Sequence, residues 1–298
     1  MLKNHFRHLR KEGICFNLLA NLWFIFICAS VIIPLWLCVT ISISDATDIV
    51  KNGYSLFPGK ISFEAYKYIT ANGGEILNAY KVTIIVTVVG TLLGCLVTSM
   101  YAYAVYRPDF KGRKFFNYFI FIPTLFSGGL VATYLWNTSI GLYDNYAVLI
   151  VPMLINAWNV IMLRAFFQTS IPFSLIESAK LDGAGEFNVF FRIACPISIP
   201  GIATIALFLA LNYWNDWYTS LIYIRSEKLY GIQFYLQRIM KNLQMLTSGT
   251  VADNGSIDVP KESVRMAICL VAIGPIIAAY PFVQKYLVKG LTVGAVKG

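Results

Sequence analysis

Six uncharged stretches of the sequence are each long enough to cross a lipid bilayer as a helix. They cover residues 13–44, 82–106, 115–143, 145–163, 193–215 and 266–284. The shortest has 19 residues, and a hydrocarbon core about 30 Å thick needs roughly 17–25 residues of helix. Because lipid offers the backbone no hydrogen-bonding partner, a spanning segment must satisfy its own peptide groups. The sequence therefore predicts an all-α membrane protein with six transmembrane helices.

The six predicted helices form a single membrane domain that covers residues 1–298. Hydrophobic residues make up 57% of the chain and charged residues 13%, whereas soluble domains carry about 25% charged residues. The first uncharged stretch is far longer than the apolar core of a cleaved signal peptide, which has about 7–15 residues. The predicted transmembrane helices are residues 16–41, 80–105, 115–136, 146–167, 197–223 and 264–288.

The distribution of basic residues predicts that both termini lie in the cytoplasm. The chain has a net charge of +9, and with the N-terminus inside, the whole surplus falls on the cytoplasmic segments. Short loops decide the orientation, and loop 106–114 holds four basic residues whereas loop 137–145 holds none. Membrane topology therefore explains the excess of basic over acidic residues, and no nucleic-acid partner is expected.

A polar segment between the fourth and fifth predicted spans has the pattern of two short helices joined by a turn. Ser174 and Glu177 stand at the spacing of a capping box, in which each side chain satisfies an exposed backbone N–H group. Gly183 is suited to the positive φ that ends a helix and turns the chain. Residues 174–192 are therefore predicted to form a helix-turn-helix on the cytoplasmic side. A hairpin lying on the lipid surface is the alternative.

The same segment resembles a known motif. Glu177-Ser178-Ala179, Gly183 and Ile193-Ala194-Cys195-Pro196 resemble the "EAA…G…I-x-L-P" loop of the membrane subunits of bacterial binding-protein-dependent ABC importers. Ser178 replaces the first alanine of that motif and Cys195 replaces its leucine. In that family the loop docks into a groove on the ATPase subunit, and the resemblance implies the same role here. The residues to which it assigns ATPase coupling are Ser174, Glu177, Ser178, Ala179, Asp182, Gly183, Ile193 and Pro196.

The resemblance continues beyond this loop. The C-terminal segment 284–298 is similar to the tail of sugar-importer permeases related to the shorter membrane subunit of the maltose system. Segments 127–129 and 214–217 are similar to the branch that handles oligosaccharides. The resemblance implies a multi-pass subunit of the bacterial cytoplasmic membrane that forms half of an oligosaccharide pathway. The implied partners are a second homologous permease subunit in a heterodimer, two ATPase subunits, an extracellular sugar-binding protein and membrane lipid.

The fifth predicted span carries aromatic and amide side chains, two kinds of group that bind sugars. Spacing of i, i+3 and i+4 places Trp214, Trp217 and Tyr218 on one side of that helix. They either line the outer cavity or form an interfacial aromatic belt, and the asparagines of the fourth span either line the pathway or hydrogen-bond between helices. The candidate pathway residues are Asn156, Asn159, Asn212, Trp214, Asn215, Asp216 and Trp217.

Two further patterns concern the packing of the spans. Gly90 and Gly94 form a small-xxx-small pair, which lets a neighbouring helix approach closely. The general frequency of glycine in membrane helices is the alternative explanation. Pro123 and Ser127-Gly128-Gly129 are predicted to bend the third span, either beside the pathway or as a packing kink.

The chain shows no active-site pattern of its own. Gly59-Lys60-Ile61 lacks the upstream glycine and the following Ser or Thr of a phosphate-binding loop, and the six cysteines show no CxxC spacing. No catalytic residue, metal site or bound cofactor is expected in this chain, and the resemblance places ATP and Mg in the partner ATPase. One alternative is an ABC permease for a non-sugar solute. The other is a stand-alone secondary transporter or channel, which needs mid-membrane carboxylates or repeated halves that the sequence does not show.

Overall fold

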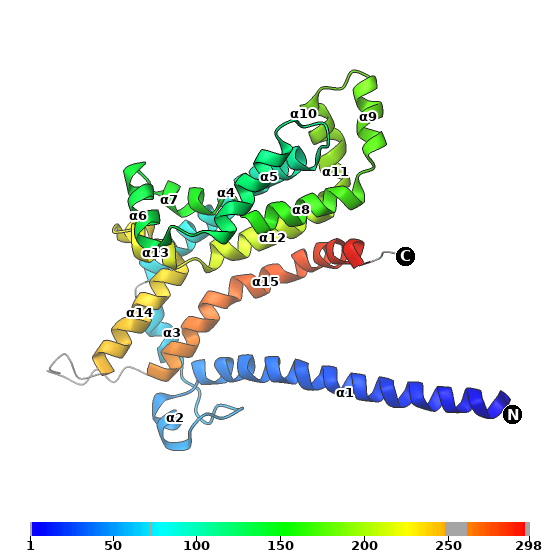
Figure 1. Ribbon diagram of the computed structural model, residues 1–298. Coiled ribbons are helices and arrows are strands. Elements are labelled where there is room, and N and C mark those ends of the chain that lie inside the picture. Colours follow the sequence, from blue (N-terminus) through cyan, green and yellow to red (C-terminus); the bar gives the residue numbers. More distant parts are fainter. Residues whose placement is uncertain (1, 72, 248–260, 296–298) are drawn as a thin grey trace. The chain divides into compact units, whose positions relative to one another are not determined.

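The chain is helical throughout the residues that its computed structural model describes, which are 2–71, 73–247 and 261–295 (Figure 1). Within these ranges there is no β-strand, only one isolated antiparallel bridge between Ser44 and Ile61. The all-α prediction is thus confirmed. The chain divides into two compact units, Met1–Asn72 with Met245–Ile273, and Gly73–Gln244 with Gly274–Gly298.

The first unit consists of three helices and the beginning of a fourth. They are α1 (Leu2–Ser42), α2 (Ala46–Asn52), α3 (Glu64–Ala71) and α15 (Lys261–Ala295), which belongs to this unit as far as Ile273. The loop after α2 folds back along the end of α1. Trp36 Nε1 donates a hydrogen bond to the Leu56 carbonyl at 2.9 Å, and Thr40 Oγ1 donates one to the Ser55 carbonyl at 3.1 Å. These bonds tie the loop to the last two turns of α1.

The second unit is built around α4 (Gly73–Tyr106), a helix of 34 residues. The other helices, in chain order, are α5 (Arg113–Leu125), α6 (Gly129–Ser139), α7 (Tyr146–Ile150), η1 (Val151–Met153), α8 (Ala157–Ser170), α9 (Phe173–Leu181), α10 (Glu186–Val189), η2 (Phe190–Ala194), α11 (Cys195–Ile197), α12 (Ile199–Asn215), α13 (Tyr218–Tyr223), η3 (Glu227–Leu229) and α14 (Ile232–Thr247). η2 is a single π-helical turn. α15 belongs to this unit from Gly274 onward.

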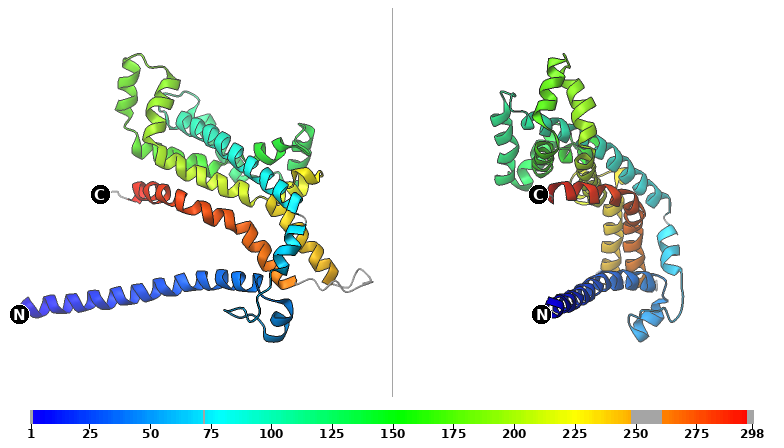
Figure 2. Two further views of the ribbon diagram at one scale, coloured as in Figure 1. Left: turned by 180° about the vertical axis from the view of Figure 1, so that it is seen from behind. Right: turned by 90° about the vertical axis from the view of Figure 1, so that its right-hand side faces the viewer.

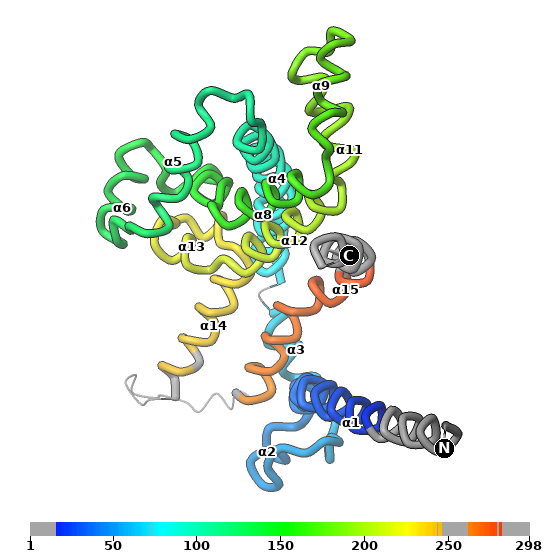
Figure 3. The backbone as a smooth tube through the Cα atoms, turned by 45° about the vertical axis from the view of Figure 1, so that its right-hand side comes forward, coloured from blue at the N-terminus to red at the C-terminus, as the bar shows by residue number. Residues whose placement is uncertain are grey.

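The face of α4 that carries Gly90 and Gly94 packs closely against α12, as the small-residue pair predicts. A Cβ atom at Gly90 would lie 2.5 Å from Cζ of Tyr213, and one at Gly94 would lie 2.9 Å from Cδ1 of Leu209. Neither position therefore has room for a larger residue. α8 packs on α4 as well, so that α4, α8 and α12 form the centre of this unit (Figures 2 and 3).

Two described helices are long and apolar enough to cross a membrane without interruption, Phe16–Ser42 within α1 and Gly73–Tyr106. Two bent helix pairs also qualify when each pair is counted as one span. They are Tyr146–Met153 with Ala157–Ser170, and Glu186–Ile197 with Ile199–Asn215. By length and composition, the described part of the chain thus provides between two and four spans of this kind.

The predicted interruption of the third span at Ser127-Gly128-Gly129 is confirmed, whereas the prediction of one unbroken helix is wrong for the fourth span. In residues 115–136, α5 ends at Leu125 and α6 begins at Gly129, whose φ of 75° lies in the left-handed region. In residues 146–167 the helix axis bends by 49°. A new helix begins there because the Asn156 side chain accepts a hydrogen bond from the Trp158 N–H at 2.8 Å. Local capping and glycine conformation thus override the continuous apolar pattern.

The prediction of one helix over residues 197–223 is also wrong. α12 begins at Ile199, after a bend of 83° from the preceding helical segment. It ends at Asn215, and Asp216 then accepts a hydrogen bond from the Thr219 N–H at 3.1 Å, which starts α13. The remaining predicted spans, 16–41, 80–105 and 264–288, lie within the longer helices α1, α4 and α15. The side chains of residues 282–298, and with them the predicted tail, lie outside the part that the structure describes.

Candidate functional site

Between α8 and α12 the chain forms a hairpin of residues 173–194, with α9 as its first arm and α10 with η2 as its second (Figure 1). Gly183 in the turn has a φ of 81°, which confirms the predicted positive value. Its N–H donates to the Lys180 carbonyl at 3.0 Å, and the N–H of Ala184 donates to the Ala179 carbonyl at 2.9 Å. These two bonds are those of a Schellman motif, which satisfies the last carbonyls of a helix. The turn therefore depends on a residue that tolerates positive φ.

The predicted capping box is wrong. Pro172 occupies the N-cap position with a ψ of 131°, and no side chain caps the helix. Because α9 already begins at Phe173, Ser174 lies inside the first turn, whereas a capping hydroxyl must stand just before it. The Leu175 N–H instead donates to the Pro172 carbonyl at 3.1 Å. Glu177 is exposed and has no capping role.

The hairpin has one buried side and one exposed side. Ile176 and Val189 are fully buried in the same apolar cluster as Phe167 of α8. Leu181, beside the turn, is 88% exposed, and Phe187 is 69% exposed. Large apolar side chains in such a position indicate a surface that is covered by another molecule. Of the predicted coupling residues, Ala179 is buried and Ile193 half-buried, whereas Ser174, Glu177, Ser178, Asp182, Gly183 and Pro196 are exposed.

Of the three phenylalanines of the second arm, only Phe190 is buried. Phe187 and Phe191 are exposed, by 69% and 50%. The second arm ends in a π-helical turn at residues 190–194.

Four charged residues, none of them a predicted site residue, form a ring beside the turn of the hairpin. Arg107 follows α4 directly, Asp109 lies in the next loop, Lys180 is on α9 and Glu186 starts α10. Lys180 Nζ lies 2.8 Å from Asp109 Oδ2 and 2.6 Å from Glu186 Oε1. Arg107 Nη1 lies 2.9 Å from Glu186 Oε2, and Arg107 Nε donates to Asp109 Oδ1 at 2.8 Å. We call these four residues the charge ring.

The ion pairs hold Asp109 and Lys180 in their charged forms over a wide pH range. Hydrogen bonds from Arg107 and then Lys180 hold the pKa of the Asp109 carboxyl well below its usual 3.8. Hydrogen bonds to Asp109 and then Glu186 raise the pKa of the Lys180 ammonium above its usual 10.5. The stabilisation from Asp109 is lost only as the pH falls through its lowered pKa, and that from Lys180 only as the pH rises through its raised pKa. Both contributions are therefore complete between about pH 4 and pH 10.

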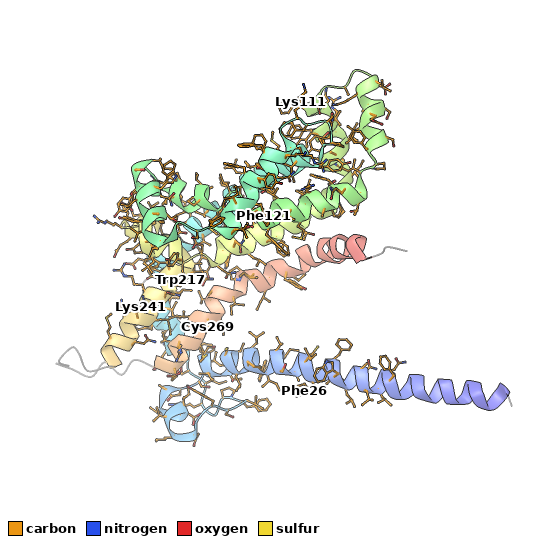
Figure 4. The ribbon with its side chains drawn as sticks, in the orientation of Figure 1. Phe26, Lys111, Phe121, Trp217, Lys241 and Cys269 are labelled. Atoms are coloured by element: carbon orange, nitrogen blue, oxygen red, sulfur yellow. The ribbon has the colours of Figure 1, made fainter. Side chains whose placement is uncertain are left out.

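The predicted pathway residues lie around the opposite end of α12 from the hairpin and on α8. Trp214 packs against Tyr80 of α4, with ring centroids 6.4 Å apart. Trp217 packs edge-to-face on Tyr218, with centroids 5.8 Å apart (Figure 4). Because α12 ends at Asn215, the three aromatic residues do not share one face of a continuous helix. The structure thus forms two aromatic pairs where the spacing predicts one stripe.

The polar pathway candidates have different local roles. Asn156 caps α8, Asn212 is exposed, and the Asn215 side chain donates to the Leu211 carbonyl at 2.9 Å. Asn159 is 4% exposed, and its Nδ2 has no hydrogen-bond partner within the described residues. A buried amide of this kind carries a desolvation cost. Asp216 caps α13.

Within the described residues, no group of three or more His, Cys, Asp or Glu side chains is arranged to hold a metal ion.

Comparison with known proteins identifies relatives along nearly the whole chain. The family described as "Binding-protein-dependent transport system inner membrane component" matches residues 90–293. The polygalacturonan/rhamnogalacturonan transport system permease protein YtcP of Bacillus subtilis is 37% identical over 281 residues, 93% of this chain and 95% of YtcP. Protein LplC of the same organism is 36% identical over the full length of both chains.

A solved structure supports the same relationship. It is the crystal structure of a bacterial ABC transporter involved in the import of the acidic polysaccharide alginate. One of its chains is 27% identical to this one, the match covers 91% of this chain and 96% of that chain, and the TM-score is 0.78.

Proposed function

The chain belongs to the family of binding-protein-dependent transport system inner membrane components, and we propose that it forms half of the pathway of an ATP-driven oligosaccharide importer. The observation that carries this proposal is the hairpin of residues 173–194, with its left-handed Gly183 and its exposed Leu181 and Phe187. A rigid turn with exposed apolar residues suits insertion into a groove on a separate ATPase subunit. ATP and Mg are bound by that subunit and not by this chain.

The proposed topology has six spans and two cytoplasmic termini in one membrane domain. The concentration of basic residues on loop 106–114 supports this orientation. The broken helices α5–α6 and α7–α8 count as one span each, since irregular backbone is tolerated at membrane depth where protein buries it. The proposed assembly is a heterodimer with a second permease subunit, in the bacterial cytoplasmic membrane, together with two ATPase subunits and an extracellular binding protein.

The proposed substrate is an oligosaccharide that carries uronic acid residues. The names of YtcP and of the alginate transporter both refer to acidic polysaccharides. Trp214, Trp217 and Tyr80 offer ring faces, and the neighbouring asparagines offer amide groups, which suits the mixed apolar and hydroxyl surfaces of sugars.

We expect uptake by the assembled transporter to depend on ATP hydrolysis. The chain is reconstituted in proteoliposomes with its partner permease, ATPase and binding protein, and uptake of a labelled oligogalacturonide is followed together with phosphate release. A transporter whose ATPase carries a disabled phosphate-binding loop serves as the control and takes up no sugar. Full uptake without any ATPase subunit, driven by an ion gradient, would instead identify a secondary transporter. ATP-driven uptake of another solute class would contradict only the substrate.

We expect Trp214→Ala and Asn215→Ala to reduce sugar uptake about threefold to tenfold, since one aromatic contact contributes roughly 0.5–1.5 kcal/mol. The amount of intact complex in the membrane should stay close to the parental amount. Trp136→Ala is the matched control, because Trp136 lies on α6 and is 67% exposed. Parental uptake by both test variants would show that the aromatic residues only anchor the end of the helix in the membrane interface.

A further inference from the structure

The charge ring joins three separate elements at one place. Its charges alternate in sign, so that each of the four residues contacts two residues of opposite charge. Two members, Lys180 and Glu186, stand on the two arms of the hairpin, on either side of the turn. The other two, Arg107 and Asp109, follow the end of α4. The ring therefore joins the two arms beside the turn and ties both of them to the end of α4.

The four members are not equally buried. Arg107 is 4% exposed, whereas the side chains of Lys180, Asp109 and Glu186 are 35%, 44% and 59% exposed. The Tyr103 hydroxyl, one turn back on α4, lies 2.8 Å from Arg107 Nη1. Exposed ion pairs contribute little each, but removal of one partner from a buried pair is strongly destabilising. Arg107 is therefore the member on which the geometry of the ring depends most.

The covalent connections of the hairpin to the membrane helices are bent at both ends. At one end Pro172 breaks the helix between α8 and α9. At the other end the chain bends by 83° before α12. A force on the turn would flex these joints unless another contact bridged them. The charge ring and the hydrogen bond from the Tyr106 hydroxyl to the Ile171 carbonyl, at 2.8 Å, provide such contacts.

We propose that Arg107 is a positioning residue for energy coupling, which fixes both arms of the hairpin to α4 through the charge ring. A displacement of the turn by the ATPase then moves α4, and with it α8 and α12, which pack on α4. This inference rests on the proposed function, because it assumes that the hairpin contacts an ATPase. It adds the route by which the motion reaches the centre of the membrane unit.

The test separates transmission of the motion from docking. Arg107→Gln removes both ion pairs of the buried member but leaves the turn and the exposed Leu181 and Phe187 in place. We expect the ATPase to co-purify with this variant. We expect the stimulation of ATP hydrolysis by sugar-loaded binding protein, and uptake per ATP hydrolysed, to fall about threefold to tenfold, as for loss of one residue from a coupled ion-pair network. Arg107→Lys, which keeps the charge, should recover part of the stimulation.

The matched control is Lys111→Gln, which removes a basic charge from the same loop but is not a member of the charge ring. Figure 4 labels Lys111. It should keep the parental stimulation. Since Arg107→Gln is a change at a buried site, Glu186→Gln provides a second variant at an exposed position. In the double variant with Arg107→Gln, Glu186→Gln should add less than its separate loss, because the two changes share the Arg107–Glu186 contact.

Two results would overturn the proposal. One is parental stimulation in both Arg107→Gln and Glu186→Gln. The other is an equal loss of stimulation in Lys111→Gln, which would show that only the total charge of the loop matters. Both results leave docking of the hairpin on the ATPase unaffected. A failure of the proposed function would look different, because the parental chain would then co-purify with no ATPase at all.

Discussion

We expect the Gly183→Val chain to insert into the membrane in parental amounts but to recover about fivefold to 100-fold less ATPase on purification. Gly183 has a φ of 81°, and apart from its two chain neighbours no described residue lies within 4 Å of the place that a Cβ would occupy. The whole cost of the substitution is therefore backbone strain, which is especially large for a β-branched residue and amounts to roughly 1–3 kcal/mol. If the backbone of the turn changes conformation to relieve this strain, the orientation of Leu181 and of the second arm changes as well. Co-purification of the ATPase and sugar-stimulated hydrolysis measure the effect.

Gly185 offers a matched control two residues away in the same exposed turn. It also has open space around its Cβ position, but its φ of −69° is accessible to any residue. Gly185→Val should therefore behave almost like the parental chain, and Gly183→Asn should be milder than Gly183→Val because asparagine tolerates positive φ. If Gly183→Val matches the parental chain in both assays, the hairpin is not the coupling element.

We expect the Gly90→Leu chain to accumulate as intact complex at no more than a small fraction of the parental amount. Even a Cβ atom at this position would lie 2.5 Å from the Tyr213 ring. That ring cannot move aside freely, because the buried Tyr213 hydroxyl donates a hydrogen bond to the Ile150 carbonyl at 2.9 Å. Overpacking costs about 1–3 kcal/mol or more, and a buried carbonyl left without its partner adds about 1–3 kcal/mol. Thermal stability of the purified complex in detergent should fall accordingly.

Two variants check the physical reason for this effect. Val89→Leu enlarges the neighbouring residue on the exposed side of α4, where Val89 is 38% exposed, and should be tolerated. Gly90→Leu combined with Tyr213→Ala exchanges volume across the contact and should recover part of the lost stability. If Gly90→Leu is as stable as the parental complex, α4 and α12 do not pack closely in the membrane.

The properties that depend on local sequence were predictable. Long uncharged runs form helices because, in lipid, a helix lets the backbone N–H and C=O groups hydrogen-bond to one another within the segment. Gly183 adopts positive φ because the Schellman motif at the end of α9 requires it. Gly90 faces the aromatic ring of Tyr213 because glycine, which has no Cβ atom, lets that ring approach the helix backbone. The predicted capping box failed for an equally local reason, since Pro172 sets the start of α9 one residue before Ser174.

By itself, the sequence thus determined the helical membrane class, the place of the hairpin and its turn, and the close-packing face of α4, because each follows from the spacing of neighbouring residues. Tertiary structure alone decided the charge ring, whereas the breaks in the fourth and fifth spans come with local hydrogen bonds to Asn156 and Asp216 that the apolar pattern does not reveal. Asp109 and Lys180 are separated by 71 residues, and Arg107 and Glu186 by 79. No periodicity relates residues so far apart. Their partnership exists only because the packing of α8 and α12 on α4 returns the hairpin to the end of that helix.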